Sequence, residues 1–171
     1  MGADMKLLLR AIICSFAFLL WGCATSAVLN TTFDPQEADF IHKSGTSIIT
    51  GQGFLRTMVG EVRYAAGSEV ILIPVTKYST ERINQIYRGG KCAVFGKTFT
   101  NDDPRYSQFT KTTKANGEGR FEFPGLAAGN YFVVTSVFWQ IPGNYFPQGC
   151  GIYEVVQLAS GEKKDVIISG S

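Results

Sequence analysis

The chain has 171 residues, of which 45% are hydrophobic and 18% charged, and its formal net charge at pH 7 is +2. A chain of this length and composition fits one compact domain with a terminal appendage. Because the basic residues are scattered and nearly balanced by acidic ones, nothing indicates nucleic-acid binding, and we expect no polyanion partner.

The N-terminus has the pattern of a secretory signal. Lys6 and Arg10 precede an uncharged run, "AIICSFAFLLWG", at residues 11–22. A positive n-region followed by a short apolar h-region is typical of such signals. A mature transmembrane helix takes about 20 apolar residues, so a retained membrane anchor is the second alternative. Met1 and Met5 both suit the start of this signal.

The h-region ends in "LWGC", which resembles the lipobox of bacterial lipoproteins. The resemblance implies that the signal peptide, residues 1–22, is cut after Gly22, that Cys23 carries diacylglycerol on its sulfur, and that its new amine is acylated. Since Ala24 follows the cysteine, the resemblance favours the outer membrane of a Gram-negative bacterium, with the domain facing the periplasm or the exterior. The alternative is an ordinary signal with a chance cysteine.

Residues 23–46 are predicted to be a tether, because they begin with the small and polar stretch "ATSAVLNTT". Within the tether, Asp34, Pro35 and Glu37 have the spacing of a capped helical turn. His42, the only histidine in the chain, lies in this segment. We expect it on the surface, since a histidine cluster or a Ser-His-Asp triad in a rigid pocket is disfavoured.

From Ser47 onward the pattern is mainly that of β-strands. The run at 69–76 is apolar enough to be buried on both faces, with Pro74 near its end, and "RFEF" alternates cleanly. Glycine-bearing turns follow, with an Asn116-Gly117 hairpin signal and "ASGEK" before the last strand. Such short strands indicate a sandwich or barrel. The predicted strands are 47–57, 69–76, 120–123, 130–139, 151–158 and 163–169.

One insert breaks this pattern. Residues 79–90, "STERINQIYRGG", have apolar side chains at helical spacing, with Ser79 or Thr80 as N-cap and Gly89 in the left-handed closing position. We expect one short helix packed on the sandwich. Residues 91–109 are less regular, and a functional loop, disorder and an extra hairpin all remain open.

The segment 111–134, "KTTKANGEGRFEFPGLAAGNYFVV", resembles the core signature of carboxypeptidase regulatory-like domains, which are transthyretin-like (prealbumin-like) sandwiches. The resemblance implies an all-β, Greek-key β-sandwich of about seven strands over residues 47–171, serving as a non-catalytic folding, spacing or interaction module. The residues that carry it are Asn116, Gly117, Phe121, Phe123, Leu126, Gly129 and Tyr131. We expect Phe121, Phe123, Leu126, Val133 and Val137 in the core, Gly129 at a sharp corner, and a hydrogen bond from Tyr131 to the backbone.

No motif for catalysis or for a cofactor is found. The stretch 101–104, "NDDP", offers carboxylates but lacks the spaced acidic pattern of a calcium loop, so we expect a solvated turn there, with calcium binding as the weaker alternative. We expect no cofactor, no metal and no catalytic residue.

Cys92 and Cys150 are predicted to form a disulfide. Cys14 leaves with the signal and Cys23 takes the lipid, so the exported domain holds only this pair. An isolated pair in an oxidising compartment tends to be oxidised. Two separate buried thiols are the alternative.

The stretch 138–149 gathers aromatic residues, including Trp139, Tyr145 and Phe146, among prolines and glycines. Exposed rings on a rigid loop would suit a glycan, a peptide or a protein partner. We favour a hydrophobic cap over the open end of the sandwich, since aromatic rings are buried by default.

The leading hypothesis is therefore a lipid-anchored, non-catalytic lipoprotein of the cell envelope, with a structural or protein-interaction role. The alternative is a glycan- or peptide-binding lipoprotein that uses the loop at 138–149. The membrane, through the lipid on Cys23, and an envelope protein or glycan are the expected partners.

Overall fold

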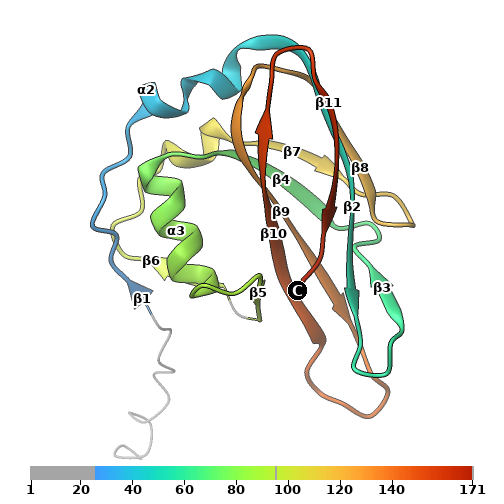
Figure 1. The fold of residues 1–171 in the computed structure, drawn as a ribbon. Helices are drawn as coiled ribbons and strands as arrows, with labels where there is room; N and C mark the ends of the chain where they lie inside the picture. Colours follow the sequence, from blue (N-terminus) through green and yellow to red (C-terminus); the bar gives the residue numbers. More distant parts are fainter. Residues whose placement is uncertain (1–25, 95, 171) are drawn as a thin grey trace, which may run out of the picture.

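The protein is a β-sandwich with one helix of three turns on its outer face (Figure 1). The computed structural model describes residues 26–94 and 96–170. The predicted all-β sandwich with a short helix is confirmed. Cys23 and the predicted signal peptide lie outside the described residues.

The described strands number eleven, and seven of them have four residues or more, in line with the predicted number. The strands are β1 (Ser26–Ala27), β2 (Ser44–Arg56), β3 (Val62–Tyr64), β4 (Glu69–Pro74), β5 (Cys92–Ala93), β6 (Thr98–Phe99), β7 (Lys111–Lys114), β8 (Arg120–Leu126), β9 (Gly129–Trp139), β10 (Gln148–Leu158) and β11 (Lys163–Ile168). The helices are α2 (Pro35–Ala38) and α3 (Lys77–Tyr87), with 3-10 turns η1 (Asp39–His42) and η2 (Tyr106–Phe109).

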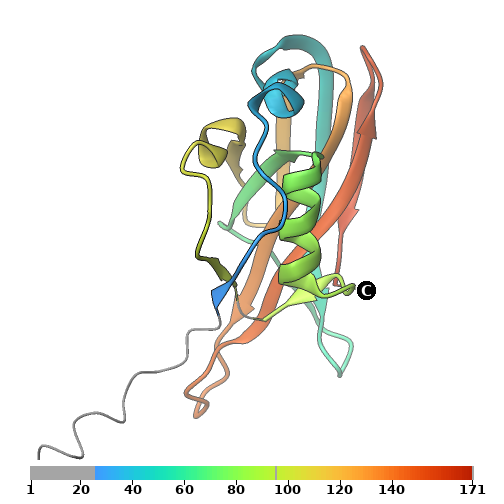
Figure 2. The same ribbon diagram turned by 90° about the vertical axis from the view of Figure 1, so that its left-hand side faces the viewer.

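Two sheets form the sandwich. The first has the order β5-β10-β9-β4-β7, and all its pairs are antiparallel. In the second, β2 pairs with β11 in parallel and with β8 and β3 in antiparallel fashion. Figure 2 shows α3 lying across the first sheet on the side away from β2. The small β1–β6 pair lies beside α3 (Figures 1 and 2).

The core between the sheets contains the side chains expected there. Phe121 and Phe123 are buried, whereas Arg120 and Glu122 on the opposite face of β8 are exposed, so the predicted alternation is confirmed. Leu126, Val133 and Val137 are also buried. Burying one such side chain stabilises the fold by about 1.5–3 kcal/mol.

The apolar run of β4 is explained by two packing partners. Val70 and Leu72 point into the core between the sheets. Ile73 belongs to a separate cluster under α3, and the half-buried Ile71 packs against it. The prediction that this strand is covered on both sides is confirmed, and the strand ends at Pro74 as expected.

The hairpin predicted at Asn116-Gly117 is wrong, and the turn expected at "ASGEK" also connects strands that do not pair with each other. The turn after Ala115 joins β7 of the first sheet to β8 of the second, and the turn at 159–162 joins β10 to β11, again across the sandwich. Asn116 does make the turn, since its Oδ1 accepts hydrogen bonds from the backbone N–H groups of Glu118 and Arg120, both at 2.9 Å. A tight turn reverses the chain equally well between sheets, so turn residues do not determine which strands pair.

The prediction of a tether over 23–46 is wrong for most of that segment. Leu29 and Phe33, each 3% exposed, pack into a cluster with Tyr78 and Phe99. The capped turn at Asp34 is confirmed, because its side chain accepts from the N–H of Gln36 at 2.9 Å and opens α2. The first long strand begins at Ser44, ahead of the predicted boundary.

The helix α3 begins earlier than predicted, and its N-cap is Thr76. The Thr76 Oγ1 accepts from the N–H of Ser79 at 3.1 Å, and the Ser79 Oγ accepts from the N–H of Thr76 at 2.8 Å, a reciprocal capping box. At the other end Gly89 has the positive φ that was expected, 84°, and the preceding residue, Arg88, is also left-handed, with φ of 52°.

The predicted tyrosine corner is confirmed. The Tyr131 hydroxyl donates to the backbone carbonyl of Ala127 at 2.8 Å. Gly129 is needed for a different reason from the one expected. A Cβ at this position would lie 2.5 Å from the ring of Phe40, so the glycine makes room for that side chain.

Candidate functional site

The predicted disulfide between Cys92 and Cys150 is present. It joins β5, at the end of the α3 insert, to β10, and the two strands also pair at this point. Cys150 is fully buried in the main core. The bridge therefore fixes the insert to the strand that follows the aromatic loop.

Two loops at one end of the sandwich form a cleft of about 510 Å³, which we call the loop cleft. The β2–β3 loop (residues 57–61) and the β9–β10 loop (residues 140–147) both lie at the lower end of Figures 1 and 2. The half-buried indole of Trp139 lines the cleft and packs against the core behind it. Of the three predicted ligand-binding residues, Trp139 is the one that lines this cleft.

The other two predicted residues stand outside this cleft, on the tip of the same loop. Tyr145 is 96% exposed and Phe146 is 76% exposed. The expectation that these rings cap the sandwich is therefore wrong. The disulfide and the core packing hold the adjoining ends of β9 and β10, but the loop between these two strands projects into solvent. Met58 and Val59 on the facing loop are exposed too, and no pattern in the sequence indicated this.

Polar side chains accompany the indole in the loop cleft. Glu61 and Arg63 form an exposed ion pair with a distance of 2.6 Å between Oε2 and Nη2. Arg56 stacks on the ring of Phe54 at 5.9 Å, and among the described residues no carboxylate pairs with it. Gln140 and Gln148 complete the polar lining. The cleft combines hydrogen-bond donors, acceptors and an aromatic surface.

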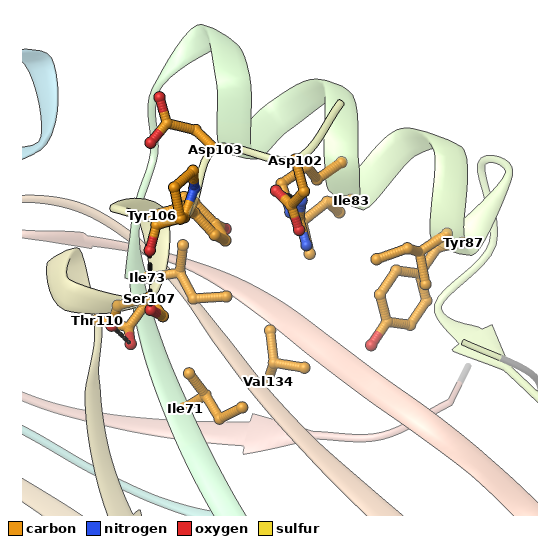
Figure 3. Close-up of a pocket in the computed structure, with 13 residues that line it drawn as sticks. Ile71, Ile73, Ile83, Tyr87, Asp102, Asp103, Tyr106, Ser107, Thr110 and Val134 are labelled. Carbon is orange, nitrogen blue, oxygen red and sulfur yellow. Dashed lines mark hydrogen bonds and ion pairs between the residues drawn. The ribbon is translucent and has the colours of Figure 1, made fainter. Parts of the chain in front are cut away.

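A second cavity of about 480 Å³, which we call the α3 groove, lies between the first sheet, α3 and the segment 102–110 (Figure 3). Its floor is formed by Ile71, Ile73 and Val134 of the sheet. The helix contributes Ile83, Ile86 and Tyr87. The sequence predicted the helix and the irregular segment, but not that they enclose a cavity.

One end of the α3 groove is closed by a charged cluster. The Arg82 guanidinium pairs with the Asp102 carboxylate and lies 4.5 Å from the ring centroid of Tyr106. Asp102 also accepts from the Tyr78 hydroxyl at 2.6 Å. Burial alone would raise the pKa of Asp102, but hydrogen bonds from Arg82 and Tyr78 outweigh it and hold that pKa below its ordinary value.

The prediction for 101–104 is confirmed in that Asn101, Asp102 and Pro104 are exposed. The turn also makes contacts that were not expected: Asp102 pairs with Arg82 of α3, and the Asn101 side chain exchanges hydrogen bonds with the backbone of Leu29 at 2.8 and 2.9 Å. This turn therefore joins the N-terminal segment to the helix. Arg82 and Asp102, 20 residues apart, gave no sequence signal of this pairing.

Within residues 26–94 and 96–170, no three His, Cys, Asp or Glu side chains gather closely enough to hold a metal ion. His42 is exposed, as expected, and its ring packs edge-on against Phe109 at 4.8 Å. None of the helices in the described part of the chain is both long enough and apolar enough to span a membrane.

Comparison with known proteins gives a likeness of fold. No family model and no curated protein matches the chain. The crystal structure of a "putative carbohydrate binding protein" from Pseudomonas aeruginosa matches with a TM-score of 0.66 and 20% sequence identity, covering 81% of this chain and 98% of that one. At this identity the match shows that the two chains share a fold.

Proposed function

We propose that the protein is a lipid-anchored, non-catalytic module of the bacterial cell envelope that binds a glycan at the loop cleft. The observation that carries this proposal is the exposure of Tyr145 and Phe146 beside a cleft lined by Trp139. Large exposed apolar patches on a protein surface often mark sites of interaction, and Met58 and Val59 add to the exposed apolar surface at this end.

The chemistry of the loop cleft suits a saccharide. A sugar ring has an apolar C–H face and a rim of hydroxyl groups, so it needs an aromatic surface together with hydrogen-bonding side chains. Trp139 offers the first, while Arg56, Glu61 and Gln148 offer the second. The shared fold with a protein described as carbohydrate binding is compatible with this proposal.

The position of the N-terminal segment indicates how an anchored protein would be oriented. In Figures 1 and 2, β1 lies nearer the end with the two loops than the end with α2. Cys23 precedes Ser26 by three residues, which reach about 10 Å when extended. A lipid on Cys23 would hold the loop cleft toward the membrane, where outer-membrane glycans are attached.

The anchor is tested by the intact mass of the protein extracted from bacterial membranes, wild type against Cys23→Ala. We expect a mature form that begins at Cys23 and carries diacylglycerol and an N-linked acyl chain, which the variant lacks. A mature form beginning at Cys23 without acyl mass would contradict the lipoprotein assignment.

The ligand is tested by titrating the mature protein, in which Trp139 is the one tryptophan left after cleavage at Gly22, with oligosaccharides released from peptidoglycan and from lipopolysaccharide while its fluorescence is followed. We expect a saturable change with one of these classes. A variant with Tyr145→Ala and Phe146→Ala should lose most of it, whereas Ile167→Ala, an exposed apolar change on β11, should retain it. No response to any oligosaccharide, together with binding of unlipidated Cys23→Ala protein to glycan-free vesicles that is lost on adding Tyr145→Ala and Phe146→Ala, would overturn glycan binding in favour of lipid contact.

A further inference from the structure

Isoleucine and valine side chains form the floor and most of the helix wall of the α3 groove, and the polar side chains of Asp102, Ser107 and Thr110 line its other wall. Its volume of about 480 Å³ is within the range of small-molecule sites, about 300–1,000 Å³. Arg82 lies over the Tyr106 ring and the Tyr87 ring packs against Tyr153, so both aromatic side chains that line the groove already have partners. The aliphatic lining residues are Ile71, Ile73, Ile83, Ile86 and Val134.

The charges at the rim of the groove are already paired. Arg82 pairs with Asp102, and Asp103 pairs with Arg105 at 2.7 Å. The groove therefore has no unpaired charge with which to attract a charged head group. An occupant that is neutral loses less hydration on entering such a site than an ionised one.

The Tyr87 hydroxyl is a potential hydrogen-bond donor in the groove, and because no side-chain oxygen of the described residues is both fully buried and without a partner, it retains contact with solvent. Tyr87 is 7% exposed, and across the described residues its hydroxyl makes no hydrogen bond. Figure 3 shows this oxygen turned from α3 toward the sheet that forms the floor. Burial raises the pKa of Tyr87 to about 12, so the phenol stays protonated and able to donate.

We propose that the α3 groove is a second binding site, which takes a neutral ligand with one aliphatic chain and an ester or alcohol oxygen. The chain lies among the isoleucines, and the ligand oxygen accepts the hydrogen bond of the Tyr87 hydroxyl. This site is separate from the loop cleft and does not depend on the glycan proposal.

The test uses the full chain in lipid nanodiscs, which avoid detergent alkyl chains, with the isoleucine δ1 methyl groups labelled for NMR. The probe is 1-hexanoylglycerol, with hexanoate as its charged counterpart. We expect saturable shifts at Ile71, Ile83 and Ile86, no shifts at the buried core residues Ile49 and Ile168, and weaker binding of hexanoate.

Two variants assign the site. Tyr87→Phe keeps the ring and removes only the hydroxyl, and we expect an affinity lower by about two- to tenfold, the effect of one neutral hydrogen bond. Val134→Trp fills the groove and should abolish the shifts, while unchanged methyl signals of Ile49 and Ile168 show that it folds.

The proposal would be overturned if the groove methyls showed no saturable shifts. It would also be overturned if both variants bound 1-hexanoylglycerol as tightly as the wild type, or if hexanoate bound more tightly than 1-hexanoylglycerol. The same spectra keep the two proposals apart, because Ile141 lines the loop cleft and reports on glycan binding alone.

Discussion

The carboxylate of Glu81 accepts two hydrogen bonds from Asn30, one from its backbone N–H and one from its side-chain amide, both at 2.8 Å. The other carboxylate oxygen accepts two more from Thr31, at 2.8 and 2.7 Å. Glu81 lies on α3, 51 residues after Asn30. This contact fastens the segment that follows Cys23 to the helix that covers the sheet.

The Glu81 contact should make stability depend on pH in the acid range. The hydrogen bond from the Asn30 backbone, followed by those from Thr31, lowers the pKa of Glu81 from 4.5 to about 2. A lowered pKa in the folded state contributes stability that is complete above the unfolded pKa of 4.5 and is lost as pH falls toward about 2.

We therefore expect the free energy of unfolding of Glu81→Gln to lie below that of wild type at neutral pH, and the gap to narrow as pH falls from about 4.5 to about 2. Urea denaturation at a series of pH values measures this gap. Glu122→Gln, on the exposed face of β8, is the control and should run parallel to wild type. A gap that stays constant with pH would contradict the role given to Glu81.

Arg82 should matter for stability through both its charge and its packing. Its side chain is 15% exposed and Asp102 is 40% exposed, so the pair is only partly shielded from solvent. We expect Arg82→Ala to cost about 1–3 kcal/mol, less than a fully buried pair would. A double-mutant cycle with Asp102→Ala measures the coupling between them. Additive losses in that cycle would show that packing on Tyr106, and not the ion pair, accounts for the effect.

The disulfide closes a loop with a sequence separation of 58 residues. By the chain-entropy relation, such a cross-link stabilises the fold by about 4 kcal/mol. Replacing both Cys92 and Cys150 by serine should lower the free energy of unfolding by this amount, as measured by urea denaturation. Reducing the disulfide of the wild type should lower it by a similar amount. If neither treatment shifted the unfolding midpoint, the bridge would have no stabilising role.

Phe33 distinguishes a packed segment from a free tether. It is 3% exposed and packs edge-on against Tyr78, with 5.4 Å between the ring centroids. Phe33→Ala should destabilise the protein by about 3 kcal/mol, as other buried phenylalanines do. Val28→Ala, at an exposed position of the same segment, should have little effect. Equal stability of the two variants would restore the tether interpretation.

Local sequence patterns predicted local structure well. The alternation in β8 and the capping residues at Asp34 depend on neighbours within a few positions, and both are present as expected. Strand pairing was less predictable. β11 pairs with β2 in parallel across most of the chain length, and no local signal distinguishes that arrangement from a hairpin with β10.

The candidate sites show the same limit. Trp139, Tyr145 and Phe146 were found because aromatic residues cluster in the sequence, yet only the structure shows which of them are exposed. The α3 groove was missed altogether. Its walls come from β4, α3 and the segment at 102–110, and each of these apolar patterns alone indicates nothing more than burial.

The most direct test of the central claim is a calorimetric titration of the full-length protein with the envelope oligosaccharide that gives the strongest Trp139 response, repeated with the Tyr145→Ala and Phe146→Ala double variant. The account predicts a saturable isotherm for the wild type and a loss of at least about tenfold in affinity for the variant, since exposed aromatic side chains at a binding site carry much of its affinity. An unchanged isotherm in the variant, or no binding of any oligosaccharide by the wild type, would contradict it.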